Sequence, residues 1–232
     1  MQSAAISWCG GWGISDTPVG YDTAIATEAP KRRISAEARR ALLFDAALHE
    51  FSAHGYEGAS LGRIAADAGV TRTVLYDHFP SKRALFVALL EAKRRELLSH
   101  LREALSTDSS GEERICAVFD AFLAFAEREP QTWRLLYPEH APVDPDVAAD
   151  HRRLHRDASR LLASMLAPDA RRAGLDPASP VAAAILALQQ AALEGLVRWW
   201  HAHPRVSREQ VLDAAMKALW RGLEGLERGG RR

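Results

Sequence analysis

The sequence predicts an all-α protein with an N-terminal unit of three helices, a long connecting helix and a C-terminal helical domain. Three observations support this fold class. Alanine and leucine are abundant and runs of β-branched residues are scarce, which favours helices over strands. Apolar residues recur at three- and four-residue spacing, as on one face of a helix. Several of these segments begin after serine or threonine and end at glycine, the residue types that cap helices.

Length and composition set the first limits on function. The 232 residues suffice for one large domain or two small ones, and 47 % of them are hydrophobic and 26 % charged, as in soluble globular proteins. The two cysteines, Cys9 and Cys116, lie far apart and form no CxxC motif. We therefore expect no disulfide framework and no structural zinc, as is typical of a cytoplasmic protein.

Neither a targeting segment nor a membrane span is expected. Residues 1–30 contain no lysine or arginine but several glycines and prolines, which is typical of a disordered tail rather than of a signal or transit peptide. The longest apolar stretch, residues 181–197, is shorter than the roughly 20 residues of a membrane helix and contains Gln189, Gln190 and Glu194. We predict a buried helix there.

Residues 35–105 are predicted to form four helices, and the caps mark their ends. The first begins at Ser35 and ends at Gly55, and the fourth begins at Ser81 and continues to residue 105. Between them lie two short helices, residues 60–69 and 71–79, separated by a turn that contains a glycine. Two short helices joined by such a turn are typical of a helix-turn-helix motif.

The start of the second short helix carries residues suited to DNA. Free N–H groups and the helix dipole favour anions at an exposed helix start. Arg72 can offer two hydrogen bonds to a guanine edge, and Thr73 can contact a neighbouring base. Tyr76, His78 and Lys82 lie further along, where phosphates would be met. Residues 31–105 also carry 13 lysines and arginines against 9 aspartates and glutamates, so this part of the chain is basic.

The segment FSAHGYEGASLGRIAADAGVTRTVLYDHFPSKRALF, residues 51–86, resembles the DNA-binding region of the tetracycline-repressor (TetR) family of transcriptional regulators. The elements that match, in chain order, are Phe51, Gly55, Tyr56, Ser60, Ile64, Ala65, Ala68, Gly69, Val70, Thr71, Leu75, Tyr76, His78, Phe79, Ser81, Lys82 and Leu85.

The resemblance implies an all-helical homodimer that binds double-stranded DNA at a palindromic operator, usually as a repressor released by a small ligand, with no cofactor. It implies a helix-turn-helix domain over residues 31–80, a connecting helix over 81–105 and a ligand-binding and dimerisation domain over 106–228. The candidate DNA-binding residues are Ser60, Arg63, Thr71, Arg72, Thr73, Tyr76, His78 and Lys82.

Four features of the basic region depart from the family pattern or leave alternatives open. Gly62 weakens a helix where helix-favouring residues are usual, and Asp77 places an acid where the family commonly has an aromatic or basic residue. Tyr76 could pack in the core instead of contacting phosphate. The stretch KRR, residues 31–33, could follow the minor groove as an arm or be a basic linker.

The C-terminal part is predicted to contain helices near residues 111–128 and 146–166, with a loop over 167–180, and two long helices at the end. The last two resemble the family's dimerising pair. Alternatively, this hairpin only closes its own core. The apolar faces of the pair are expected to include Leu186, Leu193, Val197, Trp200, Val211, Ala215, Leu219 and Leu223.

Aromatic residues in this part could line an apolar ligand pocket with glutamine side chains, including Gln190, as polar groups. The alternative is that they are core residues only. The candidate ligand-binding residues are Phe119, Phe122, Phe125, Trp133, Tyr137, Gln189 and Leu193.

An enzyme is not expected. His151 and His155 of HRRLH have a metal-ligand spacing, but the glutamate of HExxH is missing and arginines lie between them, so we predict an exposed helix face. The chain contains no GxSxG, P-loop or GxGxxG motif. The competing class is a helical architectural or protein-binding module that does not read DNA sequence.

Overall fold

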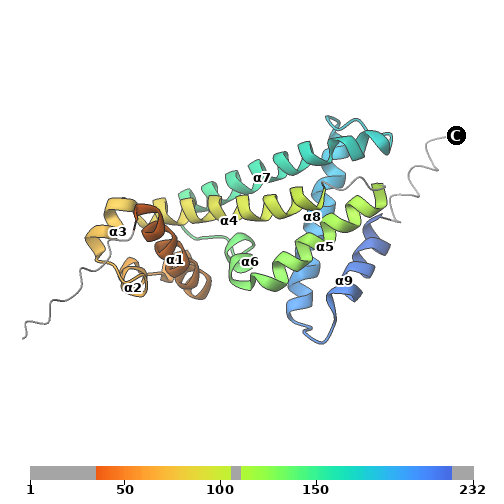
Figure 1. Ribbon diagram of the computed structural model, residues 1–232. Helices are drawn as coiled ribbons and strands as arrows, with labels where there is room; N and C mark the ends of the chain where they lie inside the picture. Colours follow the sequence, from red (N-terminus) through yellow and green to blue (C-terminus); the bar gives the residue numbers. More distant parts are fainter. Residues whose placement is uncertain (1–34, 106–110, 221–232) are drawn as a thin grey trace, which may run out of the picture. The chain divides into compact units, whose positions relative to one another are not determined.

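The computed structural model describes residues 35–105 and 111–220, which fall in one compact unit and are mainly helical (Figure 1). Within these residues there is no strand, and the predicted all-α class is confirmed. The expectations for the tail at 1–30, for the basic stretch at 31–33 and for Cys9 lie outside the described residues.

Four helices make up the first part of the described chain, close to the predicted positions. They are α1 (Ala36–Gly58), α2 (Leu61–Asp67), α3 (Arg72–His78) and α4 (Lys82–Ala104).

The capping residues explain why these helices begin where they do. The side chains of Ser35, Ser60, Thr71 and Ser81 each accept a hydrogen bond from a backbone N–H in the first turn of the helix that follows. Gly55 has a φ of 67°, which breaks the helical path of α1 at the predicted residue, although one further turn follows it.

The second part of the chain packs along and beyond α4. Its elements are α5 (Gly111–Arg128), α6 (Pro130–Leu136), α7 (Pro145–Arg172), α8 (Pro180–His201), α9 (Arg208–Ala215) and a π-helical turn, η1 (Met216–Trp220). In Figure 1, α7 runs alongside α4, while α1, α2 and α3 lie at one end of α4 and α5, α8 and α9 at the other.

The loop expected over residues 167–180 is wrong for residues 167–172, because α7 continues through Pro168 to Arg172. Asp169 is only 8 % exposed and accepts hydrogen bonds from Arg114 of α5 at 2.9 Å and from Arg172 at 3.1 Å. This buried ion pair holds the last turns of α7 against α5, so the helix persists beyond a residue that removes one backbone donor.

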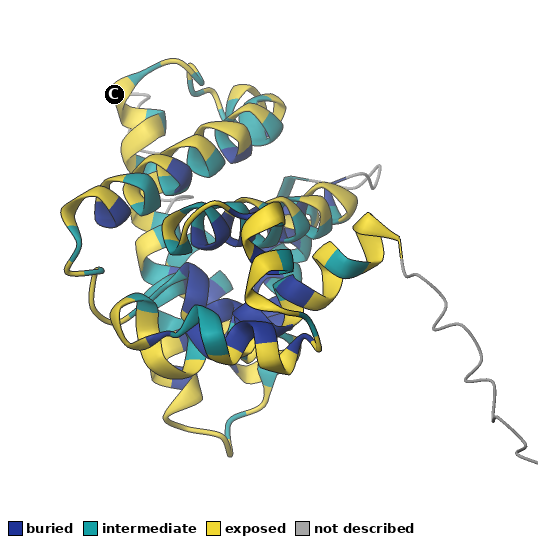
Figure 2. Cartoon of the chain, turned by 90° about the vertical axis from the view of Figure 1, so that its left-hand side faces the viewer, coloured by how far each residue is buried: buried dark blue, intermediate teal, exposed yellow. Residues whose placement is uncertain are grey.

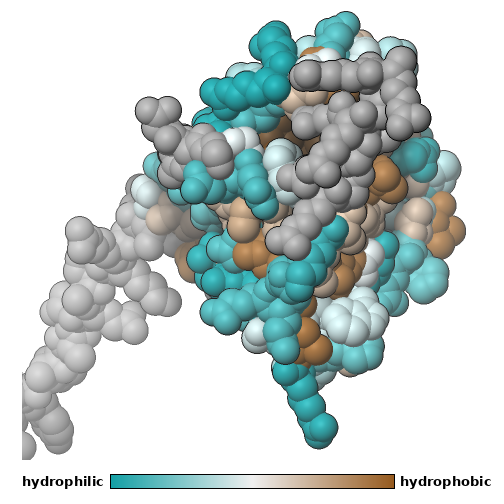
Figure 3. All heavy atoms as spheres, turned by 90° about the vertical axis from the view of Figure 1, so that its right-hand side faces the viewer, coloured by the Kyte–Doolittle hydropathy of each residue, from teal (hydrophilic) through white to brown (hydrophobic). Residues whose placement is uncertain are grey.

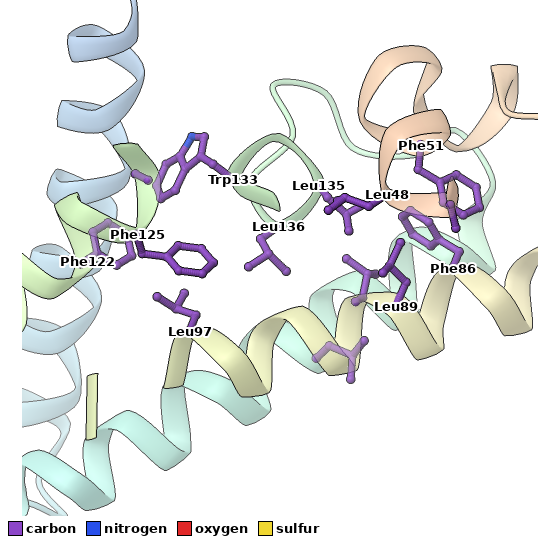
Figure 4. Packing of buried hydrophobic residues seen from close by; sticks show 14 of the residues in the cluster. Leu48, Phe51, Phe86, Leu89, Leu97, Phe122, Phe125, Trp133, Leu135 and Leu136 are labelled. Atoms are coloured by element: carbon purple, nitrogen blue, oxygen red, sulfur yellow. The ribbon is translucent and has the colours of Figure 1, made fainter. Parts of the chain in front are cut away.

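One hydrophobic core extends along α4 from the N-terminal helices to the C-terminal ones. In Figure 4, Phe86 and Leu89 of α4 lie near Phe51 at one end, and Leu97 lies near Phe122 at the other. Leu136 of α6 lies between the two groups. The two ends of α4 are therefore joined by one closely packed interior, the kind of packing that transmits strain.

The apolar faces expected to dimerise are mostly buried within the chain itself. Val197 is 0 %, Val211 1 % and Trp200 7 % exposed, and Leu193 and Ala215 are also buried. The indole N–H of Trp200 donates to the backbone oxygen of Val206 at 2.8 Å and closes the α8–α9 hairpin. These five residues therefore do not form a free interface. Leu223 lies outside the described residues.

The buried helix predicted over 181–197 is also wrong, since most of α8 is accessible. By length and composition this helix could cross a membrane, yet only 11 % of its most apolar window is buried. Val181 is 59 %, Leu188 64 % and Trp199 46 % exposed. Figure 3 looks onto the end of the molecule that contains α5, α8 and α9 and shows hydrophobic residues at the surface among hydrophilic ones.

Candidate functional site

The helix-turn-helix unit presents α3 at its surface. Ile64 and Ala65 of α2 and Leu75 of α3 are buried, and they fix the two short helices against each other. Gly69 has a φ of 65°, a left-handed conformation that lets the chain reverse between them. Figure 2, which looks onto this end, shows exposed residues on the outer sides of the helices and buried residues between them.

The start of α3 is open to solvent. The Thr71 hydroxyl accepts a hydrogen bond from the N–H of Val74 at 3.3 Å, so this side chain caps the helix. Arg72, Thr73 and Asp77 are exposed. Tyr76 is 49 % exposed, which removes the alternative that it packs in the core. The structure thus places three of the candidate side chains on one solvent-facing helix.

Gly62, which weakens α2, lies directly beneath the guanidinium of Arg72. A Cβ atom at residue 62 would lie 2.9 Å from the Nη2 atom of Arg72, a distance that real Cβ contacts essentially never show, and 3.3 Å from its Cζ atom. The missing side chain therefore provides the space in which this guanidinium lies. The sequence alone showed only a weak helix former at this position.

Arg63 and Ser60 are held by a buried carboxylate of α1. Glu50 is 2 % exposed, and its Oε1 atom accepts hydrogen bonds from the Arg63 Nε atom at 2.8 Å and from the Ser60 backbone N–H at 2.7 Å. The hydrogen bond from Arg63 holds the pKa of Glu50 below its usual value, against the opposite effect of burial. The guanidinium also donates to the Gly58 oxygen at 2.8 Å. This network anchors the beginning of α2.

Lys82 also has partners within the chain. Its ammonium group donates to the backbone oxygen of Glu57 at 3.0 Å and lies 4.8 Å from the centre of the Tyr56 ring. Burial lowers the pKa of Lys82. His78 is half-buried beside Phe79 at a ring distance of 6.4 Å. Both side chains remain candidates for phosphate contact.

A cavity lies in the C-terminal part of the chain, between α4, α5, α7 and α8. Of the seven candidate ligand-binding residues, it is lined by Phe119, Phe122, Tyr137, Gln189 and Leu193.

The other two candidates, Phe125 and Trp133, are 0 % and 2 % exposed and do not line this cavity. Trp133 packs on Tyr137 at a ring distance of 4.3 Å and on Phe122 at 5.3 Å. These two residues are therefore core residues, as the alternative to a ligand pocket predicted for the aromatic set.

The expectation that HRRLH forms an exposed face is wrong for its two histidines. His155 lines the cavity, and His151 is half-buried, because α7 packs against α4 on this side. Burial lowers the pKa of His151 to about 4, and the positive charge of Arg94 adds to the effect. Both groups are neutral bases at pH 7. Among the described residues no cluster of His, Cys, Asp and Glu side chains suits a metal ion.

Sequence reasoning missed Arg94, which is 5 % exposed and lines the same cavity. Its neighbour Arg95 is exposed, so nothing in the local sequence KRRE distinguishes the two side chains. The available signal was the position of Arg94 four residues after Leu90 and three before Leu97, which are both buried, since residues three or four apart share a helix face.

Comparison with known families gives two matches. The model described as "Bacterial regulatory proteins, tetR family" matches residues 43–89, and the model described as "Tetracyclin repressor-like, C-terminal domain" matches residues 108–223.

Individual relatives agree with these matches. The HTH-type transcriptional activator FasR of Mycolicibacterium smegmatis is 29 % identical over 194 residues, with 82 % of this chain and 85 % of that protein covered. The nucleoid occlusion factor SlmA of Vibrio vulnificus is 35 % identical over 99 residues, covering 42 % of this chain and 50 % of that protein. A crystal structure from Pseudomonas aeruginosa PAO1 has 25 % identity and a TM-score of 0.69, and covers 85 % of this chain and 94 % of that one. A TetR-like transcriptional regulator from Rhodococcus sp. RHA1 has 22 % identity and a TM-score of 0.66, covers 83 % of this chain and 100 % of that one, and supports the fold alone.

Proposed function

Because this chain belongs to the tetR family of bacterial regulatory proteins, it is a DNA-binding transcriptional regulator, and we propose that it is a cytoplasmic repressor. In this proposal a homodimer binds a palindromic operator, each subunit placing α3 in a major groove. A small apolar or amphipathic ligand in the cavity beside α4 releases the operator.

The exposed start of α3 is the observation that carries the proposal. Arg72 and Thr73 lie at the surface in the first turn, where a recognition helix contacts base edges. Of the other candidates, Tyr76 and His78 lie on the same helix, and Lys82 lies at the start of α4. We assign base reading to Arg72 and Thr73 and phosphate contact to Tyr76, His78 and Lys82.

The partner that best suits the exposed face of α8 is a second copy of this chain. The face carries Val181, Leu188 and Trp199, and Gly195 has no atom within 4 Å of the place where a Cβ would lie, so another helix can approach closely. A membrane is a poor occupant, since Gln189, Gln190 and Glu194 lie in the middle of the helix. A two-fold axis along α8 would match the symmetry of a palindromic operator.

Two connections support coupling between ligand and DNA. The guanidinium of Arg83 at the start of α4 contacts Asp146 at 2.9 Å and Asp150 at 2.8 Å, both on α7. The carboxylate of Glu57 in α1 accepts hydrogen bonds from the N–H groups of Val143 at 2.6 Å and Asp144 at 3.2 Å, just before α7. A ligand that displaces α7 or α4 therefore also displaces the helix-turn-helix unit.

Selection of genomic fragments by the purified full-length protein tests the proposal. We expect the bound fragments to share an inverted repeat whose half-sites are separated by about one helical turn of DNA, ~34–36 Å, or a multiple of it. Fragments without a common sequence, bound with a steep salt dependence, would instead favour the non-specific module. Expression of a reporter behind the selected repeat then distinguishes a repressor from an activator.

A further inference from the structure

The guanidinium of Arg94 is a positive charge in the interior of the chain. The side chain projects from the middle of α4, is 5 % exposed and lines the cavity. It donates one hydrogen bond, from Nη2 to the backbone oxygen of Leu136 at 3.3 Å, and its Cζ atom lies 5.9 Å from the centre of the Tyr137 ring. Its Nε atom is buried without a hydrogen-bond partner.

A buried guanidinium normally has a carboxylate beside it, because an unpaired charge in the interior is costly. Within the described residues no carboxylate lies within 4 Å of Arg94. Glu194 of α8 lines the same cavity but lies beyond ion-pair distance, and burial raises its pKa. The nearby His151 and His155 are neutral at pH 7, since burial lowers the pKa of both. Arg94 is therefore a buried cation with no carboxylate in hydrogen-bond contact, although the carboxyl group of Glu194 lies near enough to act on it electrostatically.

The walls of the cavity are mostly apolar, and further polar groups come from residues such as His155, Gln189 and Glu194. Leu97 and Leu101 of α4, Phe119 of α5 and Leu162 of α7 lie around it. The cavity shares Leu186 and other lining residues with a wider cleft between α7 and α8, which has a volume of about 720 Å³ and is open to solvent. Arg94 lines only the inner cavity, whereas Arg156, Arg160 and Arg172 line the wider cleft, so Arg94 is the arginine at the inner end of a passage with mostly apolar walls.

We propose that this passage binds an amphipathic organic anion, with its carboxylate on Arg94 and its hydrocarbon part between α7 and α8. A carboxylate would accept hydrogen bonds from the free Nε atom and the adjacent guanidinium nitrogen in a two-point contact. The hydrocarbon part would cover apolar side chains that otherwise face the open cleft. The proposal names the chemical class of the effector in the proposed function. Binding of the anion does not require that function, and only the release of the operator by the bound anion rests on it.

The test uses three ten-carbon probes on the full-length protein: decanoate, 1-decanol and decyltrimethylammonium. Binding is measured by calorimetry and by the change in thermal unfolding temperature. We expect decanoate to bind at least about tenfold more tightly than decanol, as a charge-assisted hydrogen bond requires, and the cation to bind most weakly. The Arg94→Gln variant should lose the preference for decanoate and keep its affinity for decanol. Arg95→Gln, which removes an exposed charge from the next position, is the matched control and should behave as the unmodified chain.

Each result decides the question. Equal affinity for decanoate and decanol, no binding of any probe, or an unchanged preference in Arg94→Gln would overturn the proposal. If the variant does not fold, the comparison of the three probes on the unmodified protein still decides. Operator binding is measured in parallel. Selective decanoate binding that leaves operator affinity unchanged supports the ligand class and contradicts the release mechanism, so the two ideas fail separately.

Discussion

Replacement of Gly62 by alanine separates the stability of α2 from DNA recognition. Glycine in a helix is less favourable than alanine by about 0.5–1 kcal/mol, so Gly62→Ala should leave the chain equally stable or slightly more stable. The new Cβ would lie 2.9 Å from the Nη2 atom of Arg72, whereas ordinary contacts begin at 3.4 Å. The guanidinium must therefore move by about 0.5 Å, comparable with the whole width of the hydrogen-bond distance range.

Because the guanidinium is the far end of a flexible, exposed side chain, we expect this displacement to weaken operator binding by about 1 kcal/mol, the lower end of the value of a two-point base contact, with the loss concentrated at one base pair in each half-site. Urea unfolding measures the stability, and competition anisotropy with operators substituted at each position measures the recognition. In an Arg72→Ala background the same change at Gly62 should have no further effect on DNA binding. An unaltered base preference in Gly62→Ala would refute the idea that the glycine positions Arg72.

Three other changes address the remaining parts of the account. Arg72→Ala should reduce base discrimination by about 1–3 kcal/mol at one position in each half-site, measured in the same anisotropy assay. An equal loss of affinity on all sequences would make Arg72 a phosphate contact. Leu188→Arg on the exposed face of α8 should convert the proposed dimer to a monomer in light scattering and weaken operator binding on the order of tenfold or more. A dimer that persists in this variant would place the interface elsewhere. Glu50→Gln should flatten the acid side of the stability–pH profile: the folded-state pKa of Glu50 is lowered, so its contribution is present above about pH 4.5 and is lost as the pH falls below that value. Parallel profiles for Glu50→Gln and the unmodified chain would contradict that assignment.

The N-terminal helices were predictable because their limits are local. A serine or threonine hydroxyl bonds to a backbone N–H three residues ahead or fewer, and Gly69 allows a positive φ wherever the chain must reverse. Such signals act over one turn of helix, so a single sequence contains them completely. The prominent positions of Arg72 and Tyr76 at the surface followed from the same reasoning.

The C-terminal part was harder to predict because its determinants act between distant segments. The end of α7 depends on the ion pair of Asp169 with Arg114, residues 55 positions apart. Likewise, the inward orientation of His151 and Arg94 depends on how α7 packs against α4, and periodicity indicates an apolar face without saying which neighbour covers it. For the same reason the sequence showed that α8 is rich in apolar residues, but it did not show which of them lie in the core of the chain and which lie on the exposed face of the helix.

The most direct test of sequence-specific operator recognition is the ratio of two affinities at one salt concentration. The full-length protein is titrated with the selected inverted repeat and with a scrambled duplex of equal length and composition. The account predicts two protomers on each repeat and a ratio of about 10³–10⁷ in favour of the repeat. A ratio near one, with both affinities falling equally steeply as salt is raised, would contradict it.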